Sequence, residues 1–315
     1  MREVLEILTP GLRQILEGVQ ELPLEEIRLR KNRPISLVFS DEEVFLNDRG
    51  QYTLDQEEGI GLNEDDFQII FQLITGSSYY ALEEELRQGY ITIKGGHRIG
   101  FTGQVVLERG EIRHIKNVSS INIRIAREIK GAAEKIVSFL IDKNGEPVNT
   151  LILSPPRSGK TTILRDLARI FATGSPELGV KGIPVGIVDE RSEIAACFKG
   201  VPQLDVGLRA DVLDGCPKAQ GMIILLRSMA PKLIVTDEIG REEDIGALVE
   251  ASNAGVSVFA TAHAKDYDDL KKRPRFSPFI KMGIFERYVI LSRNHGPGTI
   301  EAVLDSQGKA VSGRC

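Results

Sequence analysis

Hydrophobic residues in the second half of the chain occur in short, nearly continuous runs, each followed by a segment with helical periodicity. Runs of this kind are typical of parallel strands that are buried on both faces of a sheet. The predicted strands are Val148–Leu153, Val185–Val188, Leu233–Thr236 and Val256–Thr261. The alternation of strands and helices predicts an α/β domain with a parallel sheet over residues 148–315.

The first half of the chain has a different pattern, in which strands and helices do not alternate regularly. A helical pattern covers roughly the first 20 residues around Pro10. Another helix begins at Asn63 with three acidic residues in its first turn and runs to about Ile74, and a further helix starts near Ser78. The predicted strands are Ile27–Arg30, Ile35–Phe39, Glu43–Leu46, Tyr90–Lys94, Arg98–Glu108 and Ile121–Ile125. We therefore predict a smaller α+β domain with a mixed sheet over residues 1–130.

Residues 131–147 are predicted to link the two domains. A helical pattern over Ala126–Leu140 predicts a connecting helix, and Gly145-Glu146-Pro147 is typical of a turn that ends such a linker. The length of 315 residues agrees with two domains, at about 150 residues for each.

Composition limits the class of protein. With 42% hydrophobic and 27% charged residues, the chain is an ordinary globular sequence. Its longest apolar run, Met222–Leu226, is far shorter than the ~20 residues of a membrane-spanning helix, and the first residues lack the apolar core of a secretory signal. Three cysteines without C-x-x-C spacing argue against a disulfide scaffold. We therefore expect a cytoplasmic protein.

The charge balance argues against general nucleic-acid binding. The net charge is −5, and residues 1–130 carry 16 basic against 22 acidic side chains. A nucleic-acid-binding domain usually has an excess of basic residues. The absence of Trp and the 6% of aromatic residues also leave few side chains for base stacking.

A phosphate-binding loop is the sharpest motif in the sequence. It stands between the strand Val148–Leu153 and the helical pattern Thr161–Phe171. Lys160 is predicted to reach the β and γ oxygens of ATP, and Thr161 to offer its hydroxyl to Mg²⁺. Ser154 stands where the P-loop pattern has Gly, so the first turn must form without glycine's freedom. The predicted nucleotide-binding residues are Pro155, Pro156, Arg157, Ser158, Gly159, Lys160, Thr161 and Thr162.

Acidic residues follow two of the other predicted strands. Asp237 and Glu238 end the strand that begins at Leu233, at the edge where open α/β sheets bind ligands. Asp237 is predicted to hold the water shell of the metal, and Glu238 to orient and polarise an attacking water. The acids of Val188–Glu193 could tune the metal and the water, but an N-cap by Ser192 or a solvated cluster explains them equally well.

A histidine follows the strand Val256–Thr261. His263 could contact the γ-phosphate or its water, and the alternative is a structural or surface histidine.

Together these motifs resemble the stage III sporulation protein AA family, a branch of the secretion-ATPase group within the RecA/AAA-like P-loop proteins. The resemblance covers nearly the whole chain. Besides the P-loop, the matching segments are Glu26–Arg30 with Arg33-Pro34, Gly95–Gly100, Ser120–Arg127, Val188–Ile194, Asp211–Lys218 and Thr236–Gly240. The resemblance implies a RecA/AAA-like domain that follows the α+β domain.

Roles for individual residues follow from the same resemblance. Lys160 and Thr161 match the Walker A motif, and Asp237 and Glu238 match Walker B. Glu190 and Glu193 are similar to the acidic box of secretion ATPases, which adds Glu190 to the predicted metal site with Thr161 and Asp237. The segment that ends at His263 is similar to their His box.

These relatives form rings in which an N-terminal-domain arginine reaches the nucleotide of a neighbouring subunit. Arg124 and Arg98 are the candidates for that arginine, and complete the predicted catalytic set of Glu238, Lys160, His263, Arg124 and Arg98.

The function that we expect is that of a homo-oligomeric ring ATPase, hexameric by resemblance. It would use ATP and Mg²⁺ to drive assembly or transport at the mother-cell side of the forespore membranes, with membrane-embedded sporulation channel proteins as partners. One alternative is a RecA-like nucleic-acid-binding ATPase. Another is a non-hydrolysing, nucleotide-gated scaffold, which only Ser154 suggests. A small-molecule kinase fits least, because Glu238 after Asp237 favours activation of water.

Overall fold

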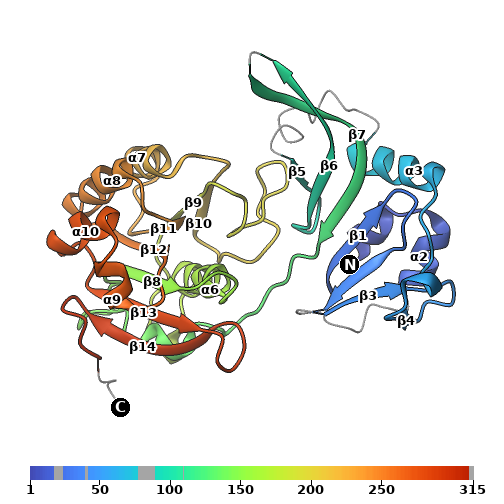
Figure 1. The fold of residues 1–315 in the computed structure, drawn as a ribbon. Helices are drawn as coiled ribbons and strands as arrows, with labels where there is room; N and C mark the ends of the chain where they lie inside the picture. The colour runs from blue at the N-terminus through green and yellow to red at the C-terminus, as the bar shows by residue number, and fades with distance from the viewer. Residues whose placement is uncertain (18–23, 40–41, 77–88, 109, 312–315) are drawn as a thin grey trace. The chain divides into compact units, whose positions relative to one another are not determined.

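The computed structural model describes residues 1–17, 24–39, 42–76, 89–108 and 110–311. It divides into two compact units, Met1–Arg127 and Glu128–Cys315. Each unit contains one sheet of seven described strands, and Figure 1 labels the elements of both. None of the described helices combines the length and the hydrophobicity that crossing a bilayer requires.

The sheet of the N-terminal unit has the strand order β4-β3-β2-β1-β7-β6-β5. Every pairing among the described strands is antiparallel, so the expected mixed sheet is wrong. Its strands are β1 (Leu24–Arg30), β2 (Ser36–Phe39), β3 (Glu42–Leu46), β4 (Tyr52–Thr53), β5 (Tyr90–Thr92), β6 (Arg98–Glu108) and β7 (Glu111–Arg124). The described helices are α1 (Arg2–Glu6), α2 (Pro10–Glu17), α3 (Glu64–Thr75) and the 3₁₀ turn η1 (Gln56–Glu58).

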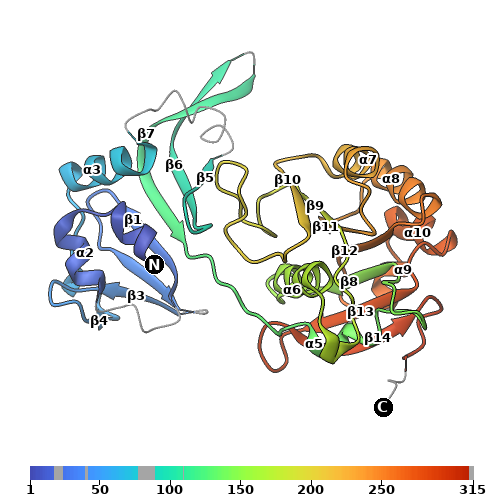
Figure 2. The ribbon, with the colours of Figure 1, turned by 180° about the vertical axis from the view of Figure 1, so that it is seen from behind.

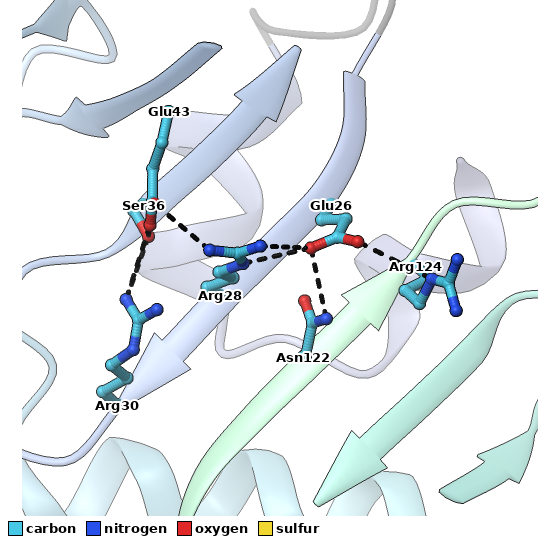
Figure 3. Close-up of polar contacts among 7 residues, drawn as sticks. All are labelled: Glu26, Arg28, Arg30, Ser36, Glu43, Asn122 and Arg124. Atoms are coloured by element: carbon cyan, nitrogen blue, oxygen red, sulfur yellow. Dashed lines mark hydrogen bonds and ion pairs between the residues drawn. The ribbon is translucent and has the colours of Figure 1, made fainter. Parts of the chain in front are cut away.

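This sheet has one apolar and one polar face because side chains alternate along each strand. On β1, Ile27 and Leu29 are fully buried and join the core with the apolar sides of α1, α2 and α3. Glu26, Arg28 and Arg30 lie on the opposite face. Figure 3 shows Glu26 near Arg124 at the end of β7, and Arg28 and Arg30 on the side of Ser36 and Glu43.

The helical pattern of the first residues forms two helices instead of one. Pro10 opens α2, since a proline has no backbone N–H and suits the first position of a helix. The helix that begins after Asn63 is confirmed, and the Asn63 side chain accepts a hydrogen bond from the N–H of Asp66. The helix expected near Ser78 lies outside the described residues.

The sheet of the C-terminal unit has the order β10-β9-β11-β12-β8-β13-β14. All pairs are parallel except β13 with β14, which is antiparallel. Four strands were predicted and are confirmed: β8 (Thr150–Ser154), β9 (Val185–Asp189), β11 (Leu233–Glu238) and β12 (Ser257–His263). Three were not predicted: β10 (Ala210–Asp214), β13 (Arg287–Ser292) and β14 (Thr299–Asp305).

Helices cover both faces of this sheet, as the two views in Figures 1 and 2 show. Successive residues of β8 point to opposite sides, so Ile152 packs with α6 and α5, whereas Leu151 and Leu153 pack with the other helices. The helices are α5 (Glu134–Val137), α6 (Lys160–Thr173), α7 (Lys218–Ser228), α8 (Glu242–Asn253), α9 (Tyr267–Lys271) and α10 (Ser277–Lys281), with 3₁₀ turns η3 (Pro176–Leu178) and η4 (Pro274–Phe276).

The connecting helix predicted over Ala126–Leu140 is wrong, because only α5 within it is helical. The backbone N–H of Ile125 donates to the carbonyl of Glu25, and that of Ala126 donates to Nδ1 of His97 at 3.1 Å. Gly131 has a φ of +81°, which a continuous right-handed helix does not contain. Contacts with distant residues therefore outweigh the local helical pattern.

Candidate functional site

The predicted site residues of the C-terminal unit come from the carboxyl ends of four adjacent strands, in the order β9, β11, β12 and β8. His263 at the end of β12 is opposite Ser154 at the end of β8 in the parallel register. Glu238 at the end of β11 is opposite Thr261 of β12. Parallel strands end at one edge of their sheet, so residues from separate motifs are gathered there.

The loop after β8 has the backbone of an anion-binding turn. Arg157 and Gly159 have φ values of +57° and +81°, and α6 begins at the next residue, Lys160. The free N–H groups at a helix start attract anions. A side chain at Gly159 would place its Cβ 2.8 Å from the backbone nitrogen of Gly298, whose N–H donates to the carbonyl of Ser158 at 3.0 Å. Position 159 therefore requires glycine both for its φ and for space.

Ser154 fits its position without strain. It is the last residue of β8, is fully buried, and has a negative φ that any residue can adopt. Its hydroxyl donates to the carbonyl of Pro155 at 2.7 Å and accepts from Nζ of Lys160 at 3.1 Å. Glycine's freedom is not needed at this position, and the serine adds a contact to the lysine.

Lys160 is surrounded by acceptors. Besides Ser154 Oγ, its ammonium contacts the carbonyls of Ser154 at 3.3 Å and Pro155 at 3.2 Å, and Nδ1 of His263 at 3.0 Å. Burial lowers the pKa of Lys160 to about 8, and the negative charge of Glu238 partly opposes this shift. Thr161 and Thr162 lie beside it in the first turn of α6, half-buried.

His263 links the lysine to Glu238. Its Nε2 lies 3.3 Å from Oε2 of Glu238, while its Nδ1 faces Lys160. The structure thus brings three predicted catalytic residues, Lys160, His263 and Glu238, into one chain of contacts. All three are partly exposed to solvent at the strand edge.

The predicted metal residues Asp237 and Glu190 converge on a lysine that the sequence analysis did not single out. Nζ of Lys218 forms ion pairs with Oε2 of Glu190 and, at 3.2 Å, with Oδ1 of Asp237. Burial raises the pKa of Asp237 to about 6, and the positive charge of Lys218 opposes the rise. Arg241 also lies near, 3.6 Å from Oε1 of Glu190.

Oxygen donors of this kind fit a divalent cation. Mg²⁺ is usually bound by one or two carboxylates together with the phosphates of a substrate. Within the described part of the chain, no group of three or more His, Cys, Asp or Glu side chains could hold a metal without further ligands. The two converging carboxylates therefore offer the ligand type, but not by themselves the ligand number, that a divalent ion needs.

The segment after β9 is held by a fully buried carboxylate. Asp189 accepts backbone N–H groups of Glu193 at 2.8 Å and of Ile194 and Ala195, both at 2.9 Å. No helix begins at Ser192 in the described residues, so the N-cap alternative is wrong. The Asp189 side chain instead fixes the loop that carries Glu190.

Arg165 of α6 also holds this loop. Its guanidinium donates to the carbonyls of Ile194 and, at 2.6 Å, Glu193, and its pKa is lowered by burial. The next residue, Asp166, accepts the N–H of Ala133 at 2.9 Å. Sequence reasoning missed this pair, although two charged residues on the otherwise apolar side of a helical pattern are a usable signal.

Arg98 and Arg124 lie in the N-terminal unit and are direct cross-strand neighbours on β6 and β7. Nε of Arg124 lies 3.6 Å from Oε1 of Glu26, and the arginine side chain is 60% exposed. The other oxygen of Glu26 binds Arg28 at 2.9 Å and Asn122 at 3.2 Å, as Figure 3 shows. The guanidinium of Arg98 lies over the ring of Tyr90, 3.8 Å from its centre.

Solved structures show the same fold. The Legionella pneumophila ATPase DotB superposes with a TM-score of 0.59 at 16% identity, covering 89% of this chain and 75% of DotB. The pilus retraction motor PilT, solved with bound ADP, gives a TM-score of 0.56 at 17% identity, covering 88% of this chain and 76% of PilT. The predicted RecA/AAA-like P-loop domain with a smaller α+β domain before it is confirmed.

Sequence comparisons extend over the full length of the chain. The chain is 43% identical to the stage III sporulation protein AA of Bacillus subtilis (strain 168), over 99% of this chain and 97% of that protein. The model of the family described as "Sporulation stage III, protein AA" matches residues 1–311. The motifs that resemble this family in sequence thus lie within one continuous match, and the chain belongs to the sporulation stage III protein AA family.

Proposed function

We propose that this protein binds and hydrolyses ATP with Mg²⁺ at the strand edge of its C-terminal unit. The contact chain from Lys160 through His263 to Glu238 carries the proposal, because it joins a phosphate-binding cation to a potential general base. The likeness of the fold to the ATPases DotB and PilT supports it.

Each residue has a separate task in this proposal. ATP bound with Mg²⁺ supplies the phosphoanhydride and part of its charge neutralisation. Lys160 binds the β and γ oxygens, together with the backbone N–H groups of the loop from Arg157 to Thr162. Glu238 orients the attacking water and accepts a proton from it. His263 contacts both Glu238 and Lys160 and so fixes the positions of these two side chains relative to each other.

Asp237, Glu190 and Thr161 are the residues that would hold the metal ion. Their oxygen atoms are the ligand type that Mg²⁺ prefers, and two of the three already contact one cationic group. Lys160 and the loop would bind the phosphates that accompany the ion.

The protein would act as a homo-oligomeric ring, as the resemblance to secretion ATPases implies, with six subunits as our working number. In such a ring Arg124, or Arg98 beside it, would reach the nucleotide of a neighbouring subunit. The name of the Bacillus subtilis relative supports a role in sporulation. We place this role in the cytoplasm at the mother-cell side of the forespore membranes, with membrane-embedded channel proteins as partners.

Turnover of ATP by the purified full chain tests the central proposal. We expect Mg²⁺-dependent phosphate release by the natural chain. Lys160→Ala should remove it and weaken the binding of a fluorescent ATP analogue by at least about tenfold, because hydrogen bonds to charged groups contribute roughly 1.5–3 kcal/mol.

Lys232→Ala is the matched control, since the Lys232 side chain forms an exposed ion pair with Glu146. Light scattering with a slowly hydrolysed ATP analogue measures assembly in the same samples. Analogue binding without any phosphate release would favour the nucleotide-gated scaffold. Unchanged affinity in Lys160→Ala would contradict the site itself.

A further inference from the structure

Lys218 is a buried cation in an unfavourable place. It is the first residue of α7, where the partial positive charge of the helix start repels a lysine. Its side chain is only 8% exposed, so it has also lost most of its hydration. Both effects oppose a lysine here, and a positive charge persists at such a site only when negative partners stabilise it.

The partners are Glu190 and Asp237, which come from the ends of two different strands. Asp237 is the last residue but one of β11 and is 7% exposed, and Glu190 directly follows β9, the neighbouring strand. One ammonium group contacts both carboxylates. These two acids are the carboxylates that the proposed function assigns to the metal. Lys218 therefore neutralises the same negative charge that would attract a metal ion.

We propose that Lys218 is an internal counter-cation that keeps Asp237 and Glu190 from binding a divalent ion in the absence of nucleotide. The inference rests on the proposed function, and it adds that the metal enters together with the nucleotide. The phosphates bring further negative charge to the edge of the sheet. Their attraction for a divalent ion then exceeds the repulsion between that ion and the ammonium of Lys218. Lys218 acts through the two carboxylates, and is therefore a positioning residue.

The electrostatic reason concerns three charges at short range. Without Lys218, the carboxylates of Asp237 and Glu190 would lose the ammonium group that contacts both, and the exposed Arg241 would remain beside Glu190. Like charges at this distance strongly favour the uptake of a cation. With Lys218 in place, a divalent ion meets a positive charge at the same position. Removal of the lysine charge should therefore tighten metal binding.

The test uses Mn²⁺ alone, without nucleotide, on the full-length chain. Electron paramagnetic resonance of free Mn²⁺ at mildly alkaline pH gives the affinity directly. We expect Lys218→Met to bind one Mn²⁺ about ten- to a hundredfold more tightly than the natural chain, from the loss of one charge–charge repulsion at a few ångströms. Lys218→Arg, which keeps the charge, should stay close to the natural chain.

Two further variants separate this effect from general loosening of the fold. Lys232→Met removes a lysine from the exposed pair with Glu146 and should leave Mn²⁺ affinity unchanged. Adding Asp237→Asn to Lys218→Met should abolish the gained binding. If Lys218→Met does not fold by circular dichroism, Lys218→Gln removes the charge but keeps a polar group and is measured in its place.

Equal Mn²⁺ affinity in the natural chain and in a folded, uncharged Lys218 variant would overturn the inference and leave Lys218 as a structural ion pair. This outcome is independent of ATP, because no nucleotide is present. Failure of the proposed function is seen elsewhere, as ATP-analogue affinity that Lys160→Ala does not change.

Discussion

The ammonium of Lys160 lies 3.0 Å from Nδ1 of His263, and since a protonated lysine can only donate, Nδ1 is the acceptor in that hydrogen bond. A neutral imidazole then carries its proton on Nε2, which faces Oε2 of Glu238 at 3.3 Å. The histidine therefore has one defined tautomer between a cation and a carboxylate.

This relationship also defines what nucleotide binding must change. In the contacts described above, the Lys160 ammonium is satisfied by protein acceptors alone. For Lys160 to bind phosphate oxygens, at least one of these acceptors must be exchanged for the ligand. If Lys160 releases His263, the contact of His263 with Glu238 can change as well. Phosphate binding and the position of the general base are therefore physically coupled.

The affinity for ATP should fall as the pH rises through about 8. The pKa of Lys160 is lowered from its usual value near 10.5 to about 8. Above that pH the free protein carries a neutral amine, which must take up a proton from solvent before it binds the phosphates as a cation, so affinity should drop by up to about tenfold per pH unit. Titration with a fluorescent ATP analogue between about pH 7 and pH 10 measures this slope. Lys160→Ala should show no such slope, and a flat profile in the natural chain would refute the lowered pKa.

Glu238→Gln should preserve ATP affinity and reduce turnover by about 10²–10⁴-fold. The amide keeps the size of the side chain and can still accept a hydrogen bond, but it cannot accept the proton of an attacking water. Single-turnover hydrolysis and analogue binding, measured on one preparation, separate the two effects. Glu242→Gln, a change in the first turn of α8, is the control. Hydrolysis at the natural rate in Glu238→Gln would show that Glu238 is only a strand end.

Arg124→Ala should bind ATP normally and hydrolyse it poorly if this arginine acts on a neighbouring subunit. In GTPases, an arginine supplied in trans contributes about 10³–10⁵ in rate. Mixing Arg124→Ala with Lys160→Ala subunits should restore part of the activity, because some interfaces then combine an intact loop with an intact arginine. Turnover of the mixture against each variant alone is the measurement.

Arg113→Ala, a change in an exposed ion pair with Glu108, controls for the loss of an arginine from the same strand. No recovery in verified mixed assemblies would remove the trans role from Arg124 and make Arg98 the next candidate. Full activity of Arg124→Ala alone would show that the contact of Arg124 with Glu26 only supports the sheet locally.

Asp189→Asn should destabilise the C-terminal unit by roughly 2–4 kcal/mol. The carboxylate is fully buried and accepts three backbone N–H groups, whereas an amide offers one oxygen and points donors at the remaining N–H groups. Chemical denaturation followed by circular dichroism gives the free energy of unfolding. Asp211→Asn, at an exposed position on β10, should change it by less than about 0.5 kcal/mol. A similar small change in Asp189→Asn would mean that the loop finds other acceptors.

Local sequence determined the parts of the site in which strand, loop and helix are neighbours along the chain. The apolar run before Ser154, the glycine at position 159 and the helical pattern after it suffice for a phosphate-binding loop, because each depends on backbone geometry within a few residues. The same holds for Glu238 at the end of β11. Four buried strands were readable because both faces of each are apolar.

Only the tertiary structure decided which charged groups meet. The pairing of Lys218 with Asp237 and Glu190, and the hold of Arg165 on the loop after Asp189, join residues about 20 to 30 positions apart through neighbouring strands. Ala126 illustrates the same principle for the backbone: its N–H donates to His97, so the helical pattern around it does not form a helix. Hydrophobic periodicity indicates which secondary structure a segment favours by itself. Which partner a buried polar group bonds to depends on the groups that the tertiary structure places next to it.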